Sequence, residues 1–348
     1  MIEGVETASE LAPFEREWDE LASSLGVSPF VRPGWIGAWW RAFGSGELTA
    51  LVLRRRGRVA GVLPLARCRG ALVSTTNWHT PQFAPVAEDE DALAELVEAA
   101  LSDTPARLDL SFLDADSPTS EACARFGRAA GFHVLVRDIQ HSPYLAIEDD
   151  WAAFHSRLPS RKTSKYRRFR KRLEERGQVS FEVSDGSERL AELLREGFAV
   201  EAAGLNGRPG TPILARADTT RFYGEVAEWA AGEGWLRLWS LRLDRKLIAF
   251  AYGLEHEGVY FDLKLGHDPD YARFGPGVLL MEARIQHAFA ASLKRFDFLG
   301  APERHKLDWT DTLHETQRLQ AFAPTVRGAI NRVVWERGRP LVKRLIPG

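Results

Sequence analysis

The sequence has few cysteines, few lysines and no long apolar run. Two cysteines, Cys68 and Cys123, are too few for a disulfide framework or a zinc cluster. No segment reaches the roughly 18 apolar residues of a membrane-spanning helix, and the first ten residues are acidic where a signal peptide is basic. These absences exclude a disulfide-rich secreted domain. They predict a cytoplasmic protein with no transmembrane segment and no metal.

The composition is that of a folded protein, but its charge is unevenly distributed. Hydrophobic residues make up 45% and charged residues 27% of the 348 residues, as in ordinary globular domains. Residues 1–150 hold 13 Lys or Arg against 23 Asp or Glu, whereas residues 151–348 hold 33 against 25. This asymmetry predicts either an anionic partner for the second half or a basic face docked on an acidic neighbouring domain.

An internal repeat organises the chain. Each copy consists of a β-hairpin, an amphipathic helix and a short strand, in the same order and with similar spacing. These segments are residues 51–65, 91–102 and 107–110 in the first copy, and residues 240–254, 278–292 and 295–298 in the second. The hairpins align Ala60 with Ala249. The repeat predicts two mixed α/β domains of one fold, at residues 1–150 and 151–322, followed by a basic helical tail at residues 323–348.

The two copies differ where the helix begins. In the second copy Arg273, Gly275 and Gly277 precede or open the helix, and glycines there let an anion approach backbone N–H groups at the positive end of the helix dipole. In the first copy the acidic run 88–91 would repel a phosphate and would cap the helix instead. We therefore expect a phosphate site in the second copy only. The alternative is that Gly-Pro-Gly is simply a turn before a helix.

The strand at residues 259–267 carries two opposite charges. Strict alternation places Asp262 and Lys264 on the same face, which would be either a solvated face or the wall of a site. The chain has only 8 Lys against 38 Arg. A lysine at this position therefore favours a role that requires an amine whose pKa can be tuned.

Several motifs together resemble a known family. The sequence is similar to the GNAT acyltransferase superfamily, and within it to the CelD-like acetyltransferases of cellulose-biosynthesis loci, which are related to the Fem-type aminoacyltransferases. The likeness extends over about residues 14–322. The motifs are Leu158-Pro-Ser-Arg161, Glu201-Ala-Ala-Gly204 with Gly207, Gly210 and Thr211, Phe222-Tyr223, residues 262–277, and Asp297-Phe-Leu-Gly300 followed by Lys306 and Trp309.

The resemblance implies tandem GNAT-like domains, with an acyl-CoA site in the second only. Acetyl-CoA or another acyl-CoA would lie between splayed strands, as the co-substrate. Its diphosphate would rest on the turn from Gly275 to Leu279. The residues assigned to its binding are Leu265, Arg273, Gly275, Gly277, Val278 and Leu279.

Transfer of an acyl group to an amine requires a base and a donor for the developing oxyanion. We assign Glu201 and Asp262 to deprotonation. For the oxyanion we assign the backbone near Leu265 and, by similarity to a Fem-type lysine, Lys306. The ordinary alternatives are that Glu201 caps or pairs at a helix end and that Lys306 is a surface residue. Asp297 has a counterpart, Asp109, in the first copy, so we expect it to be structural.

Three further side chains are assigned to the acceptor substrate. These are Lys264, Tyr271 and Trp309. The stretch Arg157–Arg176 holds ten Lys or Arg, and we expect it to form one basic helix. It would be a solvated or docking face, a contact with an anionic substrate or lipid surface, or a nucleic-acid contact, which is the least favoured of the three.

The function expected from the whole sequence is an acyl-CoA-dependent N-acyltransferase. Its acceptor would be an amine on a small molecule or on a glycan- or lipid-linked precursor of the cell envelope or an exopolysaccharide. Two alternatives stay open. One is a Fem-like transferase that uses aminoacyl-tRNA, and the other is a non-catalytic GNAT-fold protein that binds an anionic polymer, a membrane or RNA.

Overall fold

The computed structural model describes residues 1–104, 106–204 and 212–345, with side chains as far as residue 336. It divides into two compact units, Met1–His141 with His314–Gly348, and Ser142–Leu313. Residues 323–348, expected as a separate tail, fall in the first unit. The motif residues Leu205, Asn206, Gly207, Gly210 and Thr211 lie outside the described residues.

The first unit is a mixed sheet with helices. Its strand order is β1-β2-β3-β4-β6-β13-β7, with β5 paired to β3. The strands are β1 (Ile2–Val5), β2 (Glu47–Arg55), β3 (Arg58–Cys68), β4 (Ala71–Ser74), β5 (Val86–Ala87), β6 (Arg107–Asp114), β7 (His133–Ala146) and β13 (Leu313–Phe322). The helices are α1 (Ala8–Leu11), α2 (Glu15–Ser24), α3 (Pro33–Phe43), α4 (Glu90–Ser102), α5 (Pro118–Ala129) and α12 (Val326–Leu345).

The second unit repeats this plan. Its sheet order is β7-β12-β11-β10-β9-β8, where the end of β7 supplies the first strand. The strands are β8 (Val179–Ser184), β9 (Leu236–Leu243), β10 (Lys246–His256), β11 (Val259–His267) and β12 (Arg295–Asp297). The α-helices are α6 (Trp151–Arg157), α7 (Ser160–Glu174), α8 (Leu190–Gly204), α9 (Ala217–Gly232), α10 (Pro276–Ala290) and α11 (Arg304–Leu307).

The predicted repeat is confirmed in three dimensions. Each copy has an antiparallel hairpin, β2–β3 or β9–β10, and Ala60 and Ala249 are both fully buried in it. Each hairpin is followed by a strand, a helix and a second strand. The two strands that flank the helix pair in parallel, β4 with β6 and β11 with β12. The chain is therefore a mixed α/β protein built from two similar halves, as the sequence predicts.

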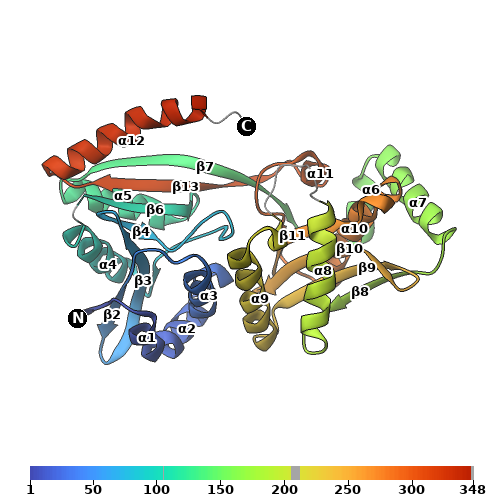
Figure 1. Ribbon diagram of the computed structural model, residues 1–348, viewed down its shortest axis with the longest axis horizontal. Coiled ribbons are helices and arrows are strands. Elements are labelled where there is room, and N and C mark those ends of the chain that lie inside the picture. Colours follow the sequence, from blue (N-terminus) through green and yellow to red (C-terminus); the bar gives the residue numbers. More distant parts are fainter. Residues whose placement is uncertain (105, 205–211, 346–348) are drawn as a thin grey trace. The chain divides into compact units, whose positions relative to one another are not determined.

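Helices cover both faces of the second unit's sheet (Figure 1). α8 and α9 pack on one face, where Gly197 lets α8 approach the ring of Phe250, and the Tyr252 hydroxyl donates to the Tyr223 carbonyl of α9. On the other face α10 joins a buried cluster with Trp239 and Tyr260. Each strand of this sheet therefore presents alternate side chains to two separate layers.

The expectation of one basic helix from Arg157 is wrong. α6 ends at Arg157 and α7 begins at Ser160, because Pro159 forces the preceding Leu158 into an extended conformation. α12, in contrast, confirms the helix expected in the C-terminal segment. It packs on the first unit's sheet, where the Trp335 ring lies under the guanidinium groups of Arg107 and Arg318.

Candidate functional site: the open edge of β11 and the start of α10

The ladder between β11 and β12 is short. Only residues 259–261 of β11 pair with residues 295–297 of β12, whereas β11 continues to His267 alongside β10. Among the described residues, the strand partners of Asp262–His267 are all on β10. The two parallel strands thus part at Asp262. The splayed strands that the resemblance implies are present, and beyond Phe261 the edge of β11 at Leu263 and Leu265 is no longer paired with β12.

The expectation that Asp262 and Lys264 share a face is wrong. Asp262 lies opposite Gly253 and Lys264 opposite Tyr252, so Leu263 is one extra residue in β11, a β-bulge. A single extra residue reverses the alternation beyond it. Asp262 consequently contacts α10, whereas Lys264 faces α8 and α9. The two side chains flank the open edge from opposite faces of the sheet.

Asp262 is part of a buried ion pair. Its Oδ1 accepts a hydrogen bond of 2.5 Å from Arg284 Nη1, and Arg284 on α10 is fully buried. In this pair Asp262 raises the pKa of Arg284 and burial lowers it, with a net increase. Arg284 was not among the residues predicted from the sequence. The signal that could have identified it is a lone arginine within the apolar pattern of its helix. Its contact fixes Asp262 in place at the point where the strands part.

Glu201 and Lys264 come together on the opposite face. Glu201 continues the inward stripe of α8 formed by Leu194, Gly197 and Phe198, and it is only 1% exposed. α8 approaches β11 closely at this point because Gly266 has no side chain, and a Cβ there would lie 2.3 Å from Glu201 Cα.

The charges of this pair are shifted by burial. Glu201 Oε2 accepts from the Ile213 backbone N–H at 2.9 Å, and Oε1 lies 4.0 Å from Lys264 Nζ. Burial raises the pKa of Glu201, and burial lowers the pKa of Lys264, against the weaker opposing effect of each on the other. The Lys264 ammonium also lies 5.3 Å from the ring centre of Tyr223. A carboxyl and an amine with shifted pKa values beside an open strand edge can exchange protons with a ligand.

Replacing Glu201 with glutamine should change how stability depends on pH. The folded protein holds the Glu201 proton more tightly than the unfolded chain does, because its pKa is raised above the ordinary 4.5. The parent's stability relative to Glu201→Gln should therefore be greatest in acid and should fall as the pH rises from about 4.5 through the raised value. Urea unfolding of both proteins over a pH series measures this difference.

A control on the same helix has the opposite sign. Arg189 lowers the pKa of the partly exposed Glu192, so its contribution is present at neutral pH and is lost in acid. Parallel pH curves for the parent and Glu201→Gln would show that burial does not perturb this carboxyl.

The start of α10 is built to leave its backbone uncapped. Gly275 precedes it with φ +62° in the left-handed region, and a Cβ there would lie 2.5 Å from the Phe169 ring of α7. Pro276 opens the helix, and its N-cap residue makes no side-chain capping hydrogen bond. At Gly277 a Cβ would still lie 3.3 Å from His267 Nδ1. The positive end of the α10 dipole therefore has room for an anion to approach the backbone.

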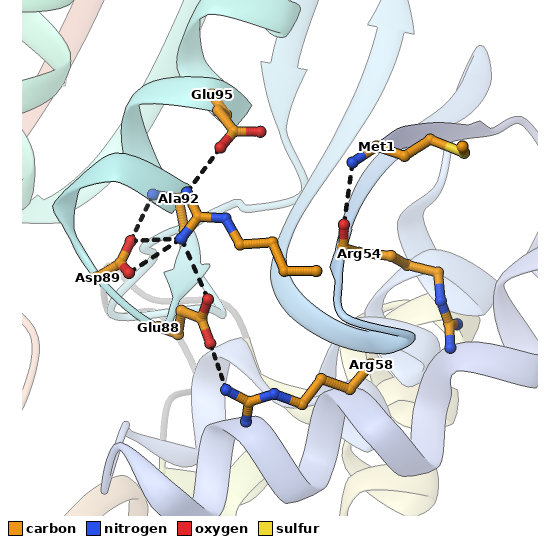
Figure 2. A network of polar contacts seen from close by, with 8 residues as sticks. Met1, Arg54, Arg58, Glu88, Asp89, Ala92 and Glu95 are labelled. Atoms are coloured by element: carbon orange, nitrogen blue, oxygen red, sulfur yellow. Dashed lines mark hydrogen bonds and ion pairs between the residues drawn. The ribbon is translucent and has the colours of Figure 1, made fainter.

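The same helix start in the first unit is closed by acidic side chains. The Asp89 carboxylate accepts from the Ala92 backbone N–H at 2.7 Å and so caps α4. Figure 2 shows that carboxylate in a network in which Glu88 and Glu95 also take part. The Arg55 guanidinium contacts all three, and Glu88 also binds Arg58. The prediction that the acidic run caps this helix is confirmed.

The other residues assigned to the donor and the acceptor surround the α10 turn. Leu265 and Val278 are half-buried against the core cluster, and Leu279 is fully buried, so their backbone groups are what a ligand could reach. The exposed Arg273 lies over the Phe274 ring, at 4.8 Å from the ring centre. Tyr271 lies under the Lys246 ammonium at 4.7 Å. The structure brings these residues to the same end of the strand.

Lys306 does not point freely into the site. Its Nζ donates to the carbonyl oxygens of Leu299 at 2.9 Å and Ala301 at 3.3 Å, and it lies 3.5 Å from the Glu303 carboxylate. These contacts match the three donors of an ammonium group. Lys306 therefore stabilises the loop that follows β12 by bonding to its backbone carbonyl groups.

Trp309 and Asp297 are both buried. Trp309 is covered by the Lys162 ammonium, 3.7 Å from its ring centre, and by the ring of Tyr166. Asp297 accepts from the Leu299 backbone N–H and from Arg295. Its counterpart Asp109 is likewise buried and binds Arg318 and Gln320. The equal burial of the two aspartates agrees with a structural role for Asp297.

The described residues contain neither a cluster of metal ligands nor a membrane-spanning helix. Residues 1–104, 106–204 and 212–345 contain no group of three or more His, Cys, Asp or Glu side chains that could hold a metal ion. The helices in these ranges are also too short or too polar to cross a membrane.

The chain is similar to known proteins in sequence over part of its length and in fold over nearly all of it. A family model described as "Acetyltransferase (GNAT) domain" matches residues 160–307, which include the open edge of β11 and the start of α10. No curated protein matches the chain. Among solved structures, FemX is similar with a TM-score of 0.64 at 12% identity, over 95% of this chain and 99% of that one.

Two other solved structures have a similar fold. The C-terminal domain of a provisionally assigned lysylphosphatidylglycerol synthetase from Agrobacterium fabrum aligns with a TM-score of 0.58 at 15% identity, over 93% of this chain and 96% of that one. L-PGS from Bacillus licheniformis aligns with a TM-score of 0.57 at 11% identity, over 92% and 96%. The chain therefore shares the fold of these structures along nearly its whole length, and residues 160–307 match the model of the GNAT acetyltransferase domain.

Proposed function

We propose that the protein is an acyl-CoA-dependent N-acyltransferase, with acetyl-CoA or another acyl-CoA as donor. The observation that carries the proposal is the juxtaposition of the open β11 edge with the uncapped start of α10. The first provides backbone partners for an extended amide-containing chain. The second provides N–H groups and a positive dipole for a diphosphate. The match to the acetyltransferase domain supports the same reading.

Different residues of the chain would then serve different steps of the acyl transfer. Glu201, buried beside Lys264, would take the proton of the acceptor amine, directly or through water. A backbone N–H near Leu265 on the open edge would stabilise the charge that develops on the carbonyl oxygen. Asp262 and Lys306 complete the proposed catalytic set. Because Arg284 and the loop carbonyls hold them, we assign them to positioning the reacting groups.

The acceptor we propose is an amine of a cell-envelope or exopolysaccharide-type precursor, modified in the cytoplasm. The CelD-like motifs support this class, and Lys264 and Tyr271 are the side chains proposed to select it, together with Trp309, which would act from its buried position beneath Lys162 and Tyr166. A lipid-linked acceptor is compatible with the similarity to the lysylphosphatidylglycerol synthetase domain. A second candidate, Fem-like transfer from aminoacyl-tRNA, is favoured by the basic surface of α7, which is suited to a polyanionic donor.

A binding screen of the full chain tests the donor. Calorimetry and thermal shift with CoA, acetyl-CoA and longer acyl-CoA thioesters should show saturable binding, and at 100 times the Kd the ligand should stabilise the protein by about 2.7 kcal/mol. A thiol-release assay with amine acceptors should then show turnover that Glu201→Gln reduces by about 100-fold or more. Binding of aminoacyl-tRNA without binding of any CoA compound would replace this proposal by the Fem-like one. Binding of neither would leave a non-catalytic protein.

A further inference from the structure

A pocket of about 870 Å³ lies between α7 and α11. We call it the basic pocket. Its lining residues are Pro159, Arg161, Lys162, Ser164, Lys165, Tyr166, Arg168, Arg304, Leu307 and Asp308. Five of the ten are cationic and one is acidic. All ten lie in the second unit, and none belongs to the residues assigned above to CoA or to catalysis.

Most of these cations have no carboxylate partner. Lys162 donates to the Asp308 carbonyl, and burial lowers its pKa to about 8, against the attraction of Asp308 and Glu282. In the part of the chain that the structure describes, ion pairs with a carboxylate are absent for Arg161, Lys165, Arg168 and Arg304. Elsewhere in the chain arginines commonly meet acids, as Arg55 does with three carboxylates. The basic pocket is therefore a concentration of uncompensated positive charge.

The first residues of α7 carry charges that the helix dipole disfavours. Acidic residues are favoured in the first turn of a helix, because its N-terminus is the positive end of the dipole. α7 instead has no acid in its first turn and no side-chain cap, and it places Arg161 and Lys162 there. Such an arrangement is unfavourable in the free protein and becomes favourable when an anion binds.

The volume of the pocket favours a small organic anion. Its volume lies within the range of small-molecule pockets, about 300–1,000 Å³, whereas a nucleic-acid groove or a membrane contact would be an extended surface. Pro159, Leu307 and the buried Tyr166 add apolar area beside the cations. A ligand that fits both features has a phosphate group attached to an organic body.

The pocket adjoins the start of α10. The Lys165 ammonium, which lines the pocket, lies 5.4 Å from the ring centre of Phe169, and the same ring packs on Gly275. One turn of α7 therefore separates this pocket from the turn that precedes α10.

We propose that the basic pocket binds an organic phosphate as a second anion site, separate from the start of α10. The phosphate would be carried either by the donor, as the 3′-phosphate of CoA, or by a phosphate-bearing acceptor. The site goes beyond the proposed acyl transfer, because anion binding here does not require that CoA be the donor.

Two triple variants on the same helix test the site. The pocket variant replaces Arg161, Lys165 and Arg168 with serine, and the control replaces Arg167, Lys171 and Arg172, which do not line the pocket. Both remove three positive charges from α7. Calorimetry with inorganic pyrophosphate at about 0.15 M salt, on full chains that also carry Gly277→Glu so that the start of α10 does not bind the probe, should show binding that the pocket variant weakens by at least about tenfold and the control by less than about threefold.

The thermal stability of the ligand-free protein distinguishes a binding role of the pocket cations from a structural one. Without ligand, the pocket variant should unfold at the same or a higher temperature than the parent, because it removes a cation from the first turn of α7. The Gly277→Glu chain should keep the pyrophosphate binding of the basic pocket even where it loses CoA and any pyrophosphate at the start of α10, so failure of the proposed function would not erase this result. A pocket variant that is unstable and still binds pyrophosphate normally would overturn the proposal.

Further ligands identify the source of the phosphate. If the donor supplies it, CoA should bind the parent about tenfold tighter than dephospho-CoA, and the pocket variant should abolish that difference. If the acceptor supplies it, CoA and dephospho-CoA should bind alike, and UDP should bind in the presence of saturating CoA. Equal losses in both triple variants, for pyrophosphate or for a single-stranded RNA, would show diffuse attraction to α7 and would contradict a pocket. No pyrophosphate binding by the parent would do the same.

Discussion

Gly277→Glu should abolish measurable CoA binding, with an affinity loss of at least about 100-fold. The new carboxylate would stand at the uncapped start of α10, where a diphosphate would meet the backbone N–H groups. Losing one charge-assisted hydrogen bond from the Gly277 N–H, of about 1.5–3 kcal/mol, amounts to roughly a factor of 10 to 100, and the like charge adds repulsion. Calorimetric titration of the purified variant with CoA measures the loss.

Two matched substitutions separate charge from shape. Gly277→Ala places a Cβ 3.3 Å from His267 Nδ1, so it requires only a small shift and should reduce affinity far less than glutamate does. Asp91→Lys changes charge at the equivalent helix of the first unit, where Asp89 closes the N-terminus, and should leave CoA affinity as in the parent. Equal losses at positions 277 and 91 would mean that CoA does not bind at the start of α10.

Asp262→Asn should destabilise the protein by about 3–5 kcal/mol, because it leaves a fully buried guanidinium without its counter-charge. Removing one partner of a buried pair is more harmful than removing both. Asp262→Asn combined with Arg284→Met should therefore recover a large part of the loss. Urea unfolding of the two single variants and the double variant measures the coupling between the two residues.

The stability measurement also decides how to interpret activity. If Asp262→Asn slows acyl transfer, the double variant shows whether the cause is a lost base or a disturbed strand. An Asp262→Asn protein as stable as the parent would contradict the buried pair, and it would return Asp262 to the candidates for direct proton transfer.

The repeated halves could be predicted because their signals are local. Hairpins alternate and turn within about fifteen residues, and the small buried Ala60 and Ala249 fall at the same position of each. The contrast between acidic residues 88–91 and the glycines near residue 276 could also be read directly, since capping depends on only a few neighbouring residues.

The arrangement of the proposed site could be predicted only in part. The faces of Asp262 and Lys264 depend on one extra residue, Leu263, and a bulge is decided by the partner strand rather than by spacing within β11. Opposite the bulge, Gly253 leaves room for the Tyr260 hydroxyl, with 2.4 Å to a Cβ built there. Neither contact is visible in a single strand. The partner of Asp262 was missed for the same reason, because Arg284 is 22 residues away along the chain.

Comparing the N-termini of α4 and α10 within one molecule shows how stability and ligand binding place different demands on the start of a helix. α4 begins with a carboxylate cap within an ion-pair network, whereas α10 begins at a glycine with no side-chain cap. The halves share one plan, so under the proposed function the first shows what this helix start becomes when no ligand has to be admitted. A substitution that gave α10 an acidic cap would follow the ordinary route to a more stable protein, and it would remove the proposed anion site. The weaker helix start is thus a feature that selection for binding, rather than for stability, would maintain.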